Sequence, residues 1–133
     1  MAHEIVSTPR LEAAIERLRP VVLAIPGAEE RRSHGSPTFF TQEGRRGRTF
    51  ASLHDERQWG EGRLCLWFAA PEGLQEALVT SGPERFFVPP YVGHRGWAGL
   101  RLDLPETDWD EAGGWIEDAY SFLTADGPDT GGP

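Results

Sequence analysis

The chain has 133 residues, about the length of one domain, and can bury a sizeable core of its own. No apolar run reaches the roughly 18 residues of a membrane span, and no basic N-terminal stretch precedes an apolar segment, so we expect a cytoplasmic protein without membrane contact. Its single cysteine, Cys65, excludes an intramolecular disulfide, and its apolar neighbours predict a buried structural thiol. The net charge of −8 argues against a surface that is basic throughout.

The charge is unevenly distributed along the chain. All 13 basic residues are arginine, and five of them lie between residues 31 and 48 against one glutamate. Residues 102–133 hold nine acidic residues and no basic one, which predicts a dipolar molecule. The Gly, Pro and Asp content of residues 124–133 predicts a disordered acidic tail after an ordered core of about residues 8–123. We therefore expect one domain over residues 1–133.

The first element in chain order is a helix. Thr8 and Pro9 are typical of a helix N-cap and first turn, and apolar residues recur at helical spacing up to Val22. Pro20 interrupts this pattern and predicts a kink, because an interior proline removes a backbone hydrogen bond. The charged run of residues 29–32 is expected to be a solvated connection.

Three strands should follow, over residues 36–42, 48–55 and 64–69, because each run is rich in β-branched or aromatic residues. They predict an antiparallel meander. Residues 43–47 would form the first hairpin turn, with glycines for the positive backbone angles and arginines at the exposed tip.

The remaining pattern predicts a short helix after Pro71, strands over 86–88 and 97–102 joined by a turn at 93–96, and a last helix capped by Asp108. The element order is then α-β-β-β-α-β-β-α. An antiparallel sheet of five strands needs its apolar face covered, so we expect an α+β two-layer sandwich with the helices on one face.

Several segments resemble the MmcQ/YjbR family in type, order and spacing: residues 23–30, 34–39, 50–54, 83–101 and 108–111. The resemblance extends over roughly residues 8–123. It implies a compact α+β domain of the CyaY-like (frataxin-like) class and a DNA-binding function through a double-wing motif. Pro20 and the acidic C-terminal end depart from the family pattern, so any DNA contact is expected at the other end of the molecule.

The first functional hypothesis is DNA binding by two hairpin wings. Arginine side chains on the first hairpin would contact phosphates together with His94 and Arg95 on the second, and an aromatic ring beside them would support the contact by stacking. Because the net charge is −8, such binding should be weak and dependent on salt. The residues assigned to this site are Arg45, Arg46, Arg48, Tyr91, His94, Arg95 and Trp97.

The alternative is a site on the uncovered face of the sheet for a small anionic or aromatic ligand, a peptide or another protein. By alternation His54 shares a face with Phe50 and Ser52, and Arg101 shares one with Trp97 and Gly99. Aromatic rings, histidine and arginine on one open face would favour such a ligand. A monomer or weak dimer is expected.

Catalysis is not predicted. His34, His54 and His94 are too widely spaced for a known metal-binding motif, and no His-Glu-x-x-His, Cys-x-x-Cys or Gly-x-Ser-x-Gly pattern occurs. We therefore expect no catalytic residues, no metal and no cofactor.

Overall fold

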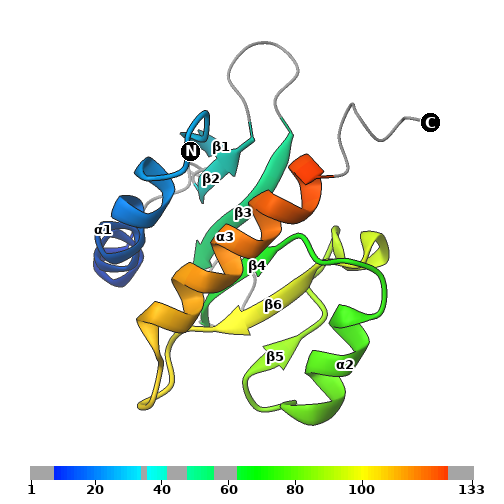
Figure 1. Ribbon diagram of the computed structural model, residues 1–133. Coiled ribbons are helices and arrows are strands. Elements are labelled where there is room, and N and C mark those ends of the chain that lie inside the picture. Colours follow the sequence, from blue (N-terminus) through cyan, green and yellow to red (C-terminus); the bar gives the residue numbers. More distant parts are fainter. Residues whose placement is uncertain (1–7, 34–35, 42–47, 56–62, 126–133) are drawn as a thin grey trace, which may run out of the picture.

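The computed structural model describes residues 8–33, 36–41, 48–55 and 63–125. These residues form three α-helices and one antiparallel sheet of six strands (Figure 1). In chain order the elements are α1 (Pro9–Leu23), β1 (Glu29–Ser33), β2 (Ser36–Phe40), β3 (Thr49–Asp55), β4 (Leu64–Phe68), α2 (Leu74–Ser81), β5 (Phe86–Phe87), β6 (Ala98–Arg101) and α3 (Trp109–Ala125). The strands lie in the order β1-β2-β3-β4-β6-β5.

The helices and the sheet form two layers, as the sequence predicted. Helices α1 and α3 lie side by side across one face of the sheet, where α3 crosses β3 and β4 (Figure 1). The short helix α2 packs beside β5 and β6 at one edge. The α+β sandwich is therefore confirmed, with six strands in place of five. No helix in the described ranges combines the length and the apolar content needed to cross a membrane.

Both predicted helix starts are present. The Thr8 hydroxyl accepts a hydrogen bond from the backbone N–H of Leu11 at 3.2 Å, and Pro9 occupies the first helical position of α1. The Asp108 carboxylate accepts from the backbone N–H groups of Asp110 and Glu111 at 3.0 and 3.1 Å. Each cap satisfies donors that have no partner within the helix. Helix α3 extends to Ala125, two residues beyond the expected end of the core, and residues 126–133 lie outside the described ranges.

The prediction for residues 29–32 was wrong, because they belong to the edge strand β1, paired in register with β2. Its side chains are charged, so it lacks the apolar alternation expected of a strand. Backbone pairing with β2 holds it, and two of its side chains reach α1. Glu30 accepts from Arg19 at 2.8 Å, and Arg32 donates to Glu12 at 2.9 Å. A polar strand can therefore form at this edge because its charges find partners in the layer above.

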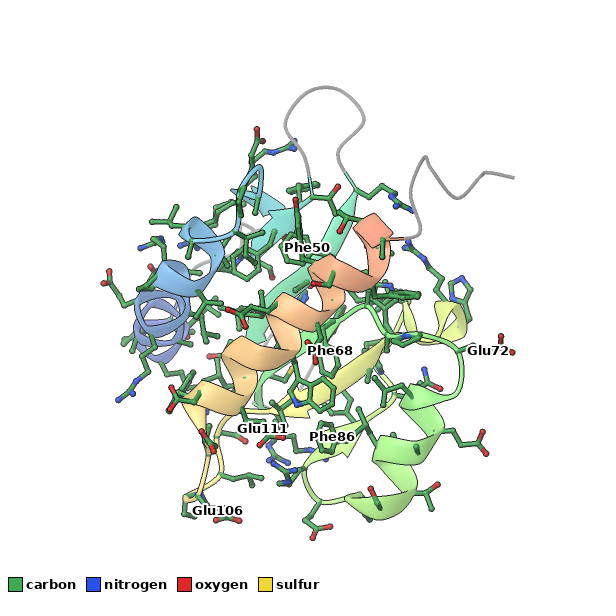
Figure 2. The ribbon with its side chains drawn as sticks, in the orientation of Figure 1. Phe50, Phe68, Glu72, Phe86, Glu106 and Glu111 are labelled. Atoms are coloured by element: carbon green, nitrogen blue, oxygen red, sulfur yellow. The ribbon has the colours of Figure 1, made fainter. Side chains whose placement is uncertain are left out.

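A β-bulge changes which face Phe50 occupies. The register moves from Phe39 opposite Ala51 to Phe40 opposite Thr49, so Phe50 has no residue opposite it. Its ring points to the helices and meets Tyr120 of α3 edge-on, with 5.3 Å between the ring centroids (Figure 2). The expected grouping of Phe50 with Ser52 and His54 was thus wrong, because simple alternation does not hold across a bulge.

Candidate functional site

A hollow of about 530 Å³ lies at the C-terminal end of α3, and we refer to it as the α3 hollow. Four segments that are far apart in the sequence form its walls: the end of β4, the first turn of α2, the loop before β6 and the last turns of α3. The residues that line it are Ala69, Ala70, Glu72, Gly73, Gln75, Glu76, His94, Arg95, Gly96, Trp97, Phe122 and Leu123.

The loop of residues 93–97, here called the His94 loop, is held in place by α2. The side-chain amide of Gln75 donates to the backbone carbonyl of Gly93 at 2.8 Å and to that of Trp97 at 2.6 Å. A Cβ atom at Gly93 would collide with the Val88 side chain, and Gly96 has a φ of +89°. The expected turn is therefore present as a single 3₁₀ turn that only glycine allows at both ends.

Arg95 and Trp97 make a contact on the wall of the hollow. The Arg95 guanidinium carbon lies 5.6 Å from the centroid of the Trp97 ring, within the range of a cation–π interaction. Trp97 is 4% exposed, whereas His94 and Arg95 are exposed. The indole therefore supports an arginine whose charge faces solvent.

Arg48 reaches the same end of the molecule from the first hairpin. Backbone N–H of Thr41 donates to the Arg48 carbonyl at 2.8 Å, which closes the hairpin at its base. The Arg48 side chain donates to the backbone carbonyl of Leu123 at 2.8 Å, at the helix end where a cation is favoured. Since Leu123 also lines the α3 hollow, Arg48 lies beside the wall formed by the His94 loop.

The described arginines divide into two groups by their partners. Most form ion pairs. In one of these pairs, the hydrogen bond from Arg85 lowers the pKa of the Glu111 carboxyl group below its usual value. The paired ones are Arg10, Arg19, Arg31, Arg32, Arg63 and Arg85. Within the described ranges Arg48 and Arg95 form no such pair, and neither do Arg17 and Arg101. The charges of Arg48 and Arg95 are thus available to a ligand.

Acidic side chains border the opposite wall of the hollow. Glu72 and Glu76 come from the start of α2, and both residues are exposed. Figure 2 shows Glu72 reaching outward from the loop before α2. The α3 hollow therefore has a cationic wall at the His94 loop, an acidic border at α2 and an apolar surface between them.

A comparison with protein families identifies the family of the chain. The family model described as YjbR matches residues 23–122, which confirms the resemblance seen in the sequence. The chain belongs to the YjbR family. No curated protein matches this YjbR sequence.

A solved structure similar to this YjbR domain is that of the Deinococcus radiodurans protein DR2400, whose domain is described as DUF419. The TM-score is 0.66 at 18% sequence identity, and the match covers 83% of this chain and 78% of that one. At this identity the similarity shows the shared fold.

His54 of this YjbR protein lies in a closed polar cluster. Its Nδ1 atom is 3.2 Å from the Ser36 hydroxyl and its Nε2 atom is 2.8 Å from the Ser52 hydroxyl. The imidazole stacks on Trp67 with 3.6 Å between the ring centroids. Burial lowers the pKa of His54 to about 3, so the ring is neutral at physiological pH. The face predicted to be an open ligand site is therefore buried at His54.

The other predicted site residues do not converge on the α3 hollow. Arg101 lies at the opposite end of β6 from Trp97, donates to the Pro83 carbonyl at 3.1 Å and covers the Phe87 ring. Tyr91 is 72% exposed with a φ of +68°, and it does not line the hollow. Arg45 and Arg46 lie outside the described residues.

The structure thus brings together Arg48, His94, Arg95 and Trp97 from the predicted set. It adds two residues that the sequence analysis missed, Gln75 and Leu123. Gln75 acts through hydrogen bonds to backbone carbonyls 18 and 22 residues away, and Leu123 through its own carbonyl. Neither role leaves a signal in the residue pattern, since any residue type supplies a carbonyl.

Proposed function

We propose that this YjbR domain is a non-catalytic binding protein of the cytoplasm that contacts DNA with the surface around the C-terminus of α3. This is the end that leads into the acidic C-terminal segment, and not the opposite end expected from the sequence. The observation that carries the proposal is the position of Arg48 and Arg95. They approach this helix end from two hairpins, and neither forms an ion pair in the described part of the chain. His94 is exposed beside them.

The chemistry of these side chains suits a phosphate backbone. A guanidinium donates several hydrogen bonds in one plane and keeps its charge at any physiological pH. Two such groups on separate hairpins can reach phosphates on either side of a groove. This is the arrangement that a double-wing motif implies. The remaining arginines contribute less, because most of them are neutralised by carboxylates of the same chain.

The net charge of −8 sets the strength of the interaction. Only the part of this surface that carries Arg48 and Arg95 should approach DNA, since Glu72 and Glu76 of the same hollow and the acidic remainder of the molecule are repelled by phosphates. We therefore propose weak binding, strong dependence on salt and no base specificity from the arginines alone. The protein would act as a monomer or weak dimer.

Fluorescence anisotropy of a labelled duplex, measured over a series of salt concentrations, tests the proposal. Arg48→Ala and Arg95→Ala should each weaken binding and reduce the slope of log affinity against log salt by about 1. Arg17→Ala is the matched control, because Arg17 also lies over a tryptophan, at 5.0 Å from the Trp109 ring centroid, but between α1 and α3.

Two results would contradict the proposal. One is the absence of duplex binding at low salt, and the other is an equal loss of affinity in Arg17→Ala, which would indicate a general charge effect.

A further inference from the structure

Arg95 presents a planar cationic group beside a buried indole at the edge of the α3 hollow. The guanidinium lies over Trp97, which is 4% exposed and cannot turn away without opening the core. Planar groups of this kind stack on nucleobases, which have both an aromatic face and a polar edge. An arginine that lies over a buried indole thus offers its other face to a base.

The backbone beneath Arg95 is equally constrained. Gln75 donates to the carbonyls on both sides of the His94 loop, at Gly93 and at Trp97. A Cβ at Gly93 would lie 2.5 Å from Val88 Cγ1, and Gly96 has a φ of +89°, which residues other than glycine rarely adopt. A loop built in this way keeps its shape without a ligand, as preformed binding sites do.

The α3 hollow beside Arg95 has the size of a small-ligand pocket. Its volume of about 530 Å³ falls within the range of roughly 300–1,000 Å³ found for such sites. Phe122 and Leu123, both half-buried, provide apolar surface, which suits a ring better than a phosphate group. A base that is paired and stacked in a duplex cannot enter, so the ring must come from an unpaired nucleotide.

The acidic border determines which end of the nucleotide enters. Glu72 and Glu76 would repel a phosphate but can accept hydrogen bonds from the exocyclic amino group of a base. The phosphate then remains outside, where Arg48 is held at the end of α3 without a carboxylate partner in the described residues. Cytosine, adenine and guanine carry such an amino group on the pairing edge, whereas thymine does not.

We infer that the α3 hollow binds one unpaired, amino-bearing nucleobase, stacked on the guanidinium of Arg95, with its phosphate near Arg48. This inference rests on the proposed function, because it uses the same two arginines, and it identifies single-stranded rather than duplex nucleic acid as the ligand with the higher affinity. Both a free monophosphate and a strand contain such a nucleotide.

The test compares ligands that share phosphates and differ in bases. Anisotropy is measured for labelled 12-residue strands of deoxycytidylate, of thymidylate and of abasic sites, and for a 12-base-pair duplex. Oligodeoxycytidylate should bind about tenfold tighter than the abasic strand, and tighter than oligothymidylate, because a stacked base adds an interaction that phosphates do not supply. Deoxycytidine monophosphate as a competitor distinguishes a free nucleotide from a strand.

Arg95→Lys separates stacking from charge, because lysine keeps the charge and lacks the plane. It should reduce the ratio between the deoxycytidylate and abasic strands to about threefold or less while the salt dependence stays the same. Arg17→Lys, at the other arginine–tryptophan contact, should leave the ratio unchanged. Leu123→Trp fills the hollow and keeps the backbone carbonyl that Arg48 binds. It should remove the difference in affinity between the deoxycytidylate and abasic strands.

The outcomes separate this inference from the proposed function. Equal affinity for the abasic and deoxycytidylate strands overturns the inference, and duplex binding that depends on Arg48 would still support the proposed function. Competition by deoxycytidine monophosphate without binding of any strand supports the nucleotide site and overturns DNA binding. A ratio that survives both Arg95→Lys and Leu123→Trp places the base elsewhere and overturns the inference.

Discussion

The sheet face beneath α1 and α3 and the part of the opposite face around His54 are both buried, but by different interactions. On the helix side, Phe50 meets Tyr120 edge-on, and Phe68 stacks on Trp115 with 5.1 Å between the ring centroids (Figure 2). On the opposite side, His54 is joined to two serine hydroxyls and lies flat on Trp67. The first face depends on filled volume, whereas the second depends on hydrogen bonds and on the protonation state of one ring.

The largest expected effect concerns the apolar face. Phe68→Ala should lower the free energy of unfolding by about 3–5 kcal/mol, because the ring is 1% exposed and its removal leaves a cavity under α3. Urea denaturation measures the loss. Phe87→Ala, on the opposite face, should cost less because the Phe87 ring is only half buried. Equal losses would show that the two faces do not differ in packing.

The polar face should respond to pH. The pKa of His54 is lowered to about 3 in the folded protein, from 6.5 in the unfolded chain, so between these values the unfolded chain binds a proton that the folded protein does not. Stability should therefore fall as the pH drops below 6.5, by up to about 1.4 kcal/mol per pH unit. Urea midpoints between pH 6.5 and 5 measure this slope before carboxylates such as Glu111 contribute.

His54→Gln is the control for the pH effect. Glutamine carries an amide that does not titrate, so the decline in stability between pH 6.5 and 5 should become much shallower in this variant. An unchanged slope would assign the effect to another group and contradict the neutral, buried state of His54.

A smaller effect is expected from one hydroxyl of the same cluster. Ser52→Ala removes the partner of the His54 Nε2 atom, which lies 2.8 Å away, and leaves a buried polar atom with one fewer hydrogen bond. The cost should be about 1–2 kcal/mol. Ser81→Ala, at the exposed end of α2, should change the stability by less than about 0.5 kcal/mol. If Ser52→Ala lowers the free energy of unfolding by no more than Ser81→Ala does, the hydrogen bonds around His54 contribute little to stability.

The smallest effect concerns the helix above the apolar face and has the opposite sign. Gly114→Ala should raise the stability by about 0.5–1 kcal/mol, because Gly114 lies in α3 and a Cβ there meets nothing within 4 Å. At Gly113 the Cβ would lie 3.0 Å from Val21 Cγ2 of α1, so Gly113→Ala should gain less or lose stability. Thermal unfolding compares the two, and equal gains would contradict close packing of α1 on α3.

Local chemistry allowed part of this fold to be predicted. The Thr8 cap and the Asp108 cap each act within a few residues, so the sequence contains the whole interaction. The strands β3 and β4 were predicted because each run is rich in apolar, β-branched or aromatic residues. The order of the predicted elements supplied the two-layer arrangement, which the structure confirms, and the match to residues 23–122 confirms the family resemblance.

What could not be predicted depends on contacts between distant segments. The strand β1 is held by backbone pairing, which leaves no pattern in its side chains. The bulge at Phe50 turns this side chain to the other face of the sheet, which strict alternation along the strand does not predict. The α3 hollow depends on the contact of Gln75 with the His94 loop and on that of Arg48 with the last turn of α3. These contacts exist only once the sheet has formed.

The composition of β1 has a consequence for association between copies of the protein. An exposed edge strand offers free N–H and C=O groups to any other extended chain. At β1, however, a second strand would have to approach a row of glutamates and arginines at positions 29–32, of which Arg19 and Glu12 already engage two. Those charges would have to give up water to be covered. At high concentration the charged rim should therefore oppose growth of the sheet into aggregates.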